Sequence, residues 1–339
     1  MVAVAALSSC GGGAVRPAGV VLVPDRAAVG RHWSWSPSCP AAQNRGDGCA
    51  PEGRPVGTVQ LNADAWNLGP SSQGVVTMSA DGGGALTIAG RFATAPPCDE
   101  STCVASRAGT WVRGYPSVLY GLDQCHAATS ARPSRALSLP VRVGAIPPDL
   151  VGTTTYNVGR ADATYDVAYD LWLDPSATSA PCQHDGTLEI MVWTDYDARA
   201  LLPGSGRLDS ATVPFATDGT RHAGTNAWSV YADNIEPDGH TAPWGGTLWF
   251  ILDRADLVAD GSVRVDLSGI LSAAGDLLRQ DFGWDGIDGY WLDTVPFGIE
   301  FGPHSATAYG QEPMSFSLRL SAYCLAPGST VASAPCPRA

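Results

Sequence analysis

The sequence contains no lysine. All 20 basic residues are arginine, and they face 33 acidic residues, so the net charge at neutral pH is −13. A chain this acidic repels polyanions, and we therefore expect no nucleic-acid partner. Charged residues make up only 16% of the chain, whereas hydrophobic residues make up 45%. This composition excludes a charge-rich disordered protein and allows a sizeable core in 339 residues.

Several motifs of catalysis and metal binding are also absent. The nine cysteines include no CxxC pair, and the six histidines show no ligand spacing with them, so we expect no metal and no other cofactor. The GxSxG turn of serine hydrolases does not occur. Glutamate is scarce. Because aspartate is common in turns, the few glutamates are the acids that most need an explanation. They are Glu52, Glu100, Glu189, Glu236, Glu300 and Glu312.

Glycine and proline are abundant, with 39 and 26 residues, and this favours many turns and short strands over long helices. Short runs rich in Val, Thr, Tyr, Trp and Leu predict strands, and one segment with helical spacing, 263–279, predicts a helix. The expected strands include 74–79, 85–92, 165–173, 188–193, 228–231, 247–252, 295–301 and 315–321. We expect an all-β jelly-roll sandwich of two antiparallel sheets with a concave substrate cleft and one helix.

The amino terminus resembles the end of a bacterial lipoprotein signal peptide. Residues 7–10 match a lipobox, and Cys10 would be the lipidated residue. We expect residues 1–10 to be a signal-peptide remnant, 11–54 a tether and irregular Cys- and Pro-rich segment, and 55–339 one β-jelly-roll domain. The chain would be secreted or held at the cell surface, with the membrane contacted only through this anchor. The other eight cysteines would form four disulfides whose pairing the sequence leaves open.

Three predicted strands place carboxylates in line with aromatic or small residues. Alternation puts two sets outward: Asp166, Ala168, Asp170, Trp172 and Asp174 in one strand, and Glu189, Met191 and Trp193 in the next. In a third strand, Glu300 shares its face with Gly298 and Gly302, which suggests room for a bulky substrate. Carboxylates beside flat apolar side chains suit the binding and cleavage of sugars.

At these residues the sequence resembles glycoside hydrolase family 12, which comprises β-jelly-roll endoglucanases and xyloglucanases, in its actinobacterial type. Residues 114–121 resemble the family's YPS strand, and 166–174 resemble its AYD-[IL]-[WF] strand. Residues 188–193 resemble the E-[IL]-M-[IV]-W strand of the nucleophile, and 297–300 resemble the segment of the acid/base.

The resemblance implies a role for each matching residue. Glu189 would be the nucleophile, Glu300 the general acid/base, and Asp170 the neighbour that hydrogen-bonds the nucleophile. We expect the substrate to contact Met191, Trp193, Trp172, Trp66 and Tyr120. Family members retain anomeric configuration, which requires carboxyl groups about 5–5.5 Å apart.

The sequence also departs from the family. Phe301-Gly302 follows the acid/base where Pro and an aromatic residue are usual, the Trp of an early strand is missing, and segments 233–246 and 281–291 are longer. The resemblance as a whole implies a retaining endo-β-1,4-glucanase acting on β-linked glucan, and we expect a monomer. The alternatives are hydrolysis of xyloglucan or mixed-linkage β-glucan at the same site, and a non-catalytic glycan-binding lipoprotein of the cell surface.

Overall fold

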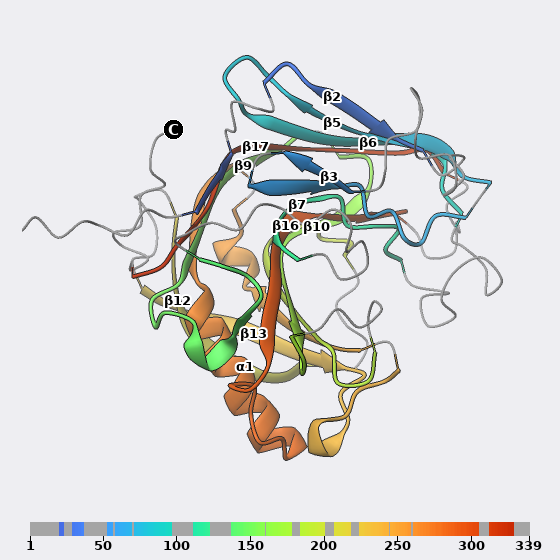
Figure 1. Cartoon of the computed structure of the whole chain (residues 1–339). Helices are drawn as coiled ribbons and strands as arrows, with labels where there is room; N and C mark the ends of the chain where they lie inside the picture. Colours follow the sequence, from blue (N-terminus) through green and yellow to red (C-terminus); the bar gives the residue numbers. More distant parts are fainter. Residues whose placement is uncertain are drawn as a thin grey trace, which may run out of the picture.

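The computed structural model describes residues 20–23, 29–36, 53–56, 58–69, 71–96, 111–122, 137–159, 161–177, 184–200, 207–217, 224–243, 245–258, 260–304 and 312–328. Within them, strands dominate and one α-helix is present, as the sequence predicts. Figure 1 shows strands β2, β5 and β6 stacked above β3, β7, β16 and β10, with helix α1 at the opposite end of the molecule.

The strands form two layers. The first contains, in order of pairing, β3 (Gly53–Val56), β4 (Val59–Asn62), β7 (Ser117–Gly121), β16 (Trp291–Gly302), β10 (Thr164–Asp174), β11 (Leu188–Tyr196), β14 (Gly246–Leu252) and β13 (Gly224–Asp233). The second contains β2 (His32–Trp35), β5 (Gln73–Ala80), β6 (Leu86–Thr94), β17 (Met314–Ala326), β9 (Val151–Val158) and β15 (Asp260–Asp266). The short β8 (Val141–Arg142) adds to β16.

Two details differ from the expected pair of separate antiparallel sheets. Strand β12 (Arg207–Thr217) pairs with β13 along most of its length and with β15 at its end, so the hydrogen bonding is continuous from one layer to the other. Strands β11 and β14 are parallel, whereas all other named pairs of the described strands are antiparallel. The sandwich is thus one sheet folded over on itself.

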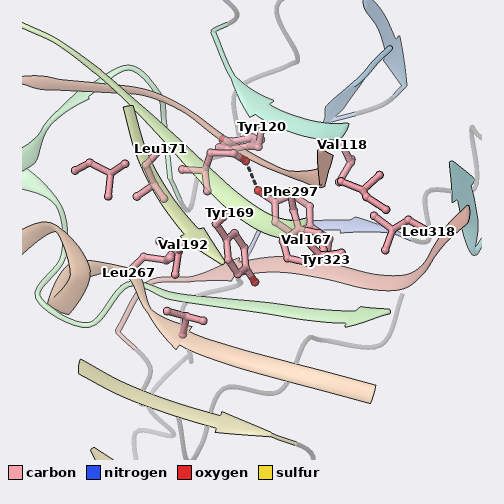
Figure 2. Close-up of a cluster of buried hydrophobic side chains, with 14 of the residues drawn as sticks. Val118, Tyr120, Val167, Tyr169, Leu171, Val192, Leu267, Phe297, Leu318 and Tyr323 are labelled. Atoms are coloured by element: carbon pink, nitrogen blue, oxygen red, sulfur yellow. Dashed lines mark hydrogen bonds between the residues drawn. The ribbon is translucent and has the colours of Figure 1, made fainter. Parts of the chain in front are cut away.

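The main core lies between the two layers. Phe297 of the first layer contacts Tyr156 and Tyr323 of the second, and Tyr169 of the first layer contacts Tyr323, with ring centroids 5.3–6.3 Å apart. Figure 2 shows Tyr169, Phe297 and Tyr323 close together in this core. All four side chains are almost completely buried. Offset and edge-to-face contacts of this kind add about 0.5–1.5 kcal/mol per pair to the stabilisation from burial itself. These contacts hold the two layers together behind the strands that carry the predicted catalytic glutamates.

Helix α1 (Leu267–Phe282) starts later than the sequence predicts. Residues 263–266 belong to β15. Over so short a stretch, the alternate burial of Val263 and Val265 fits a strand as well as a helix, so the sequence pattern did not show where the helix begins. The helix begins where the Asp266 side chain accepts a hydrogen bond from the Gly269 backbone, and it ends at Gly283 in the left-handed conformation. None of the described helices is long and apolar enough to span a membrane.

The segment 11–54 contains strands rather than only an irregular tether. Val20–Val23, which forms β1, pairs with β17, while β2 pairs with β5 and β3 with β4. Cys324 of β17 is buried. The other cysteines, Cys10 among them, lie outside the described residues, so the disulfides and the lipid attachment stay predictions.

The two long segments noted in the sequence contact each other. The indole N–H of Trp284 donates to the backbone oxygen of Glu236 at 2.7 Å, and the Trp284 ring stacks on Tyr290. The first segment is also tied to the turn before β11, since Asp185 accepts hydrogen bonds from the Thr241 backbone and the His240 ring. The segments therefore form one unit near the start of β11.

Candidate active site

Strand β10 brings the predicted catalytic residues onto one face, because it lies between β11 and β16. On one side Trp172 pairs with Glu189, and Asp170 pairs with Met191. On the other side Asp166 pairs with Glu300. We call the surface formed by Asp166, Asp170, Trp172, Glu189, Met191 and Glu300 the carboxylate face. The alternate side chains of β10, Val167, Tyr169 and Leu171, belong to the main core on the opposite side.

Glu189 and Asp170 have different hydrogen-bond partners. Glu189 is half-buried, and its Oε2 accepts a hydrogen bond of 2.9 Å from the hydroxyl of Thr247, which lies opposite it on β14. Asp170 is buried, and its Oδ2 accepts a hydrogen bond of 2.9 Å from the indole N–H of Trp172. Its Oδ1 has no hydrogen-bond partner among the described residues. Asp170 is thus held by Trp172, in place of the expected hydrogen bond to Glu189.

Burial raises the pKa of three carboxyl groups on this face. Desolvation is the main cause for Glu300 and Asp170, whose pKa values lie well above the ordinary range, and for Asp166, whose pKa rises to about 8. Neighbouring negative charge adds to the effect, because Glu189 raises the pKa of all three groups. Glu300 is only 9% exposed, and this burial favours its protonated form.

Tyr115 lies among these carboxyl groups. Its hydroxyl donates a hydrogen bond of 2.7 Å to the backbone oxygen of Ala168, midway between Asp166 and Asp170 on β10. Burial raises the pKa of Tyr115, and the charges of Asp170, Asp166 and Glu300 raise it further. The neutral phenol therefore covers β10 at the centre of the carboxylate face.

The glycines beside Glu300 make room for the chain itself and not for a substrate, which corrects the expectation from the sequence. A Cβ on Gly298 would lie 2.5 Å from the backbone oxygen of Pro116, and one on Gly302 would lie 2.1 Å from that of Trp111. The segment 111–116 therefore runs directly against β16. Hydrogen bonds from Ile299 to Pro116 and from Arg113 to Phe301 fix it there.

The same segment holds the turn that carries Trp66. The Tyr115 backbone N–H donates to the oxygen of Asp64 at 2.7 Å, and the side chain of Asn67 donates to the oxygen of Val112 at 2.7 Å. Asp64 has a left-handed φ of 32°, which few residues other than glycine adopt. Its charge raises the pKa of both Glu300 and Asp170, so this turn lies next to the carboxylate face.

The structure places the residues expected to contact substrate in different surroundings. Met191 and Trp172 lie on the carboxylate face, and half-buried Trp66 lies on the adjoining turn. Trp193 also points to this side of the sheet, but it is only 2% exposed and packs against Tyr196.

Tyr120 was wrongly expected at the substrate. It is 1% exposed in the main core, and its hydroxyl donates to the backbone oxygen of Leu137. Alternation along β7 turns it away from the face that Glu300 occupies.

Two further residues at this face were given no role from the sequence, although alternation already placed Asp166 there. Asp166 pairs with Glu300 across β10 and β16, and Tyr115 lies among the buried carboxyl groups. A second, smaller apolar cluster contains Met191 and Trp193 beside the partly exposed rings of Trp111, Tyr231 and Trp249. Strand alternation could have identified Tyr115, since it lies on the opposite side from Tyr120. Within the described part of the chain, no group of three or more His, Cys, Asp or Glu residues could hold a metal ion.

Comparisons with known proteins identify the fold. No protein-family model and no curated protein matches the sequence. Among solved structures, a family 12 xyloglucanase from Bacillus licheniformis is similar with a TM-score of 0.52 at 16% identity, over 79% of this chain and 92% of that one. An endo-1,4-β-glucanase, the cellulase CelB2, is similar with a TM-score of 0.52 at 16% identity, over 81% and 95%. The chain has the fold of the family 12 glycoside hydrolases. At this identity the likeness establishes the fold alone.

The close approach at Gly298 predicts a loss of stability in Gly298→Ala. The added methyl group would overlap the Pro116 backbone, and such overpacking costs about 1–3 kcal/mol. The free energy of unfolding from urea titration measures this. Gly289→Ala is the matched control, because no atom lies within 4 Å of its added Cβ. Equal stabilities of the two variants would contradict the contact.

The buried carboxyl groups predict stability that falls as the pH rises. Folded Glu300, Asp170 and Asp166 keep protons that the unfolded chain releases near pH 4, so the folded state loses relative stability between about pH 4 and pH 8. Unfolding free energies at about pH 5.5 and pH 8.5 measure the slope. We expect Glu300→Gln to flatten it, because a neutral amide needs no proton. An unchanged slope in this variant would show that Glu300 is ionised in the folded protein.

Proposed function

We propose that this chain is a retaining glycoside hydrolase that cleaves internal β-1,4 bonds of a glucan. The observation that carries the proposal is the different environment of two glutamates on one face. Glu189 is half-buried and accepts a hydroxyl hydrogen bond, which favours the carboxylate. Glu300 is buried beside other carboxyl groups, which favours the protonated acid. Such a division is what an acid and a nucleophile need at the same pH.

The proposed reaction has two steps. In the first, Glu300 donates its proton to the glycosidic oxygen while the Glu189 carboxylate attacks the anomeric carbon, so the C–O bond breaks and a glycosyl ester forms. In the second, the Glu300 carboxylate takes a proton from water, the resulting hydroxide attacks the same carbon, and the ester bond to Glu189 breaks. Two displacements restore the original anomeric configuration. The steps use no group other than these two side chains and water.

The proposed substrate is a β-linked glucan. The similar structures include proteins named as an endo-1,4-β-glucanase and as a xyloglucanase. The partly exposed rings of Trp66, Trp172 and Trp249 offer flat apolar surfaces for sugar rings near the two glutamates. Xyloglucan is the second candidate because one of the similar structures is named a xyloglucanase.

We also propose that the protein is exported and anchored through Cys10.

The first test is the release of reducing sugar from soluble cellulose, mixed-linkage β-glucan and xyloglucan. We expect turnover that Glu189→Gln abolishes and that Glu300→Gln lowers by roughly 10²–10⁴-fold, the usual contribution of a general acid/base. The matched control is Glu312→Gln, because Glu312 is exposed just before β17 in the other layer. Binding of glycan with no turnover by the folded wild-type protein would favour the non-catalytic alternative.

The leaving group separates the two roles. A dinitrophenyl glycoside needs no protonation to depart, so we expect Glu300→Gln to retain far more activity on it than on the polysaccharide. Azide added to Glu189→Ala should yield a glycosyl azide, since a small anion can replace the missing carboxylate on its own face of the sugar. Equal loss on both substrates in Glu300→Gln would contradict its assignment as the acid.

A further inference from the structure

Asp166 is a buried acid that the proposed reaction does not yet use. It lies directly opposite Glu300 in the pairing of β10 with β16, and its side chain is 0% exposed. Among the described residues, no N–H or O–H group donates a hydrogen bond to either of its carboxylate oxygens. The carboxyl group of Glu300, opposite it on β16, is placed to share a hydrogen bond with it. Two carboxyl groups form such a bond only when at least one of them carries a proton.

The groups around this pair are acidic or neutral. Asp170 on the same strand, Glu189 and Asp195 on β11 and Asp64 on the neighbouring turn add negative charge, and Tyr115 adds a phenol. In the described part of the chain, neither Asp166 nor Glu300 forms an ion pair with an Arg or a His. Since no Arg or His of the described residues forms an ion pair with either group, we expect protons to neutralise the pair.

We propose that Asp166 is a positioning residue for Glu300, and that the reacting form of the enzyme holds a proton on each of these two carboxyl groups. This inference rests on the proposed function, because it assigns a role relative to the acid/base. When Glu300 gives its proton to the glycosidic oxygen, its new carboxylate accepts a hydrogen bond from the Asp166 O–H. The Asp166 proton stays on Asp166 throughout the step. Without it, the transfer would leave two adjacent negative charges in a buried position.

The titration of Glu300 distinguishes a shared hydrogen bond with Asp166 from a merely structural role of Asp166. Two hydrogen-bonded acids lose their protons in two separate steps. The pKa of the first step lies below the pKa that a single acid would have in that place, and the pKa of the second step lies above it. Replacing Asp166 with asparagine keeps the size of the side chain and removes one titrating group. Glu300 should then lose its proton in a single step that lies between the two.

The scarcity of glutamate makes this measurable. With the glutamate carboxyl carbons labelled with ¹³C, the protein gives only six carboxyl signals, and Glu300→Gln identifies the one from Glu300. We expect the main titration step of Glu300 in the substrate-free protein to move down by about one pH unit or more in Asp166→Asn. Asp174→Asn is the matched control, since Asp174 is equally buried on β10 but is held by His184 and Ser176. An unchanged Glu300 titration in folded Asp166→Asn would overturn the proposal.

The pH profile of kcat/KM provides the kinetic readout. As the pH rises, wild-type activity should fall when the pair of carboxyl groups loses its first proton. The activity of Asp166→Asn should fall only when Glu300 itself loses its proton. We therefore expect the alkaline limb to move to higher pH in this variant, with no such movement in Asp174→Asn. A limb that stays in place or moves to lower pH would overturn the requirement for a second proton.

The two readouts keep this inference separate from the proposed function. A titration shift in a protein that turns over no glucan would support the pairing of Asp166 with Glu300 and reject the hydrolase. Turnover without the titration shift would support the hydrolase and reject the pairing. If Asp166→Asn fails to fold, Asp166→Ser, which is neutral and smaller, serves for both measurements with the same expected directions.

Discussion

Strand β10 lies between β11 and β16 and turns its side chains alternately toward two buried environments. One set, which includes Tyr169, packs into the aromatic core between the layers. The other set faces Glu189 on one neighbouring strand and Glu300 on the other. Because the pleat alternates with a period of two residues, a shift of the register by one residue would move both sets at once. The core therefore fixes the register that aligns the two glutamates.

The carboxylate face lowers the stability of the folded protein. Its buried acids lack cationic partners among the described residues, and burial of an acid is tolerated only when a proton neutralises its charge or hydrogen bonds replace its lost hydration. Trp172 donates a hydrogen bond to Asp170, and Asp166 and Glu300 lie opposite each other where they can share a hydrogen bond. A face built only for stability would carry apolar residues here. The retained carboxyl groups, with Glu300 raised well above its ordinary pKa, agree with a site that moves protons.

Short runs of strand-forming residues predicted the eight cited strands, and alternation predicted the faces of Glu189, Asp170 and Glu300, because both depend only on neighbouring residues. It could not predict the parallel pair β11–β14 or the continuity through β12, since strand order depends on contacts between distant segments. Gly298 and Gly302 show the same limit. The space beside a glycine can be filled by a substrate or by a neighbouring segment of the chain. The path of residues 111–116 decides between the two, and the local sequence does not reveal that path. Tyr120 was misplaced because its direction relative to Glu300 follows from pairing with β16.

The central claim is that Glu189 and Glu300 act together in a double displacement. It is tested most directly by following the anomeric protons by ¹H NMR during hydrolysis of a β-linked cello-oligosaccharide. The account predicts that the β-anomer of the new reducing end appears first and that the α-anomer grows in later, through slow mutarotation in solution. Initial formation of the α-anomer would show a single displacement by water and would contradict the assignment of Glu189 as nucleophile.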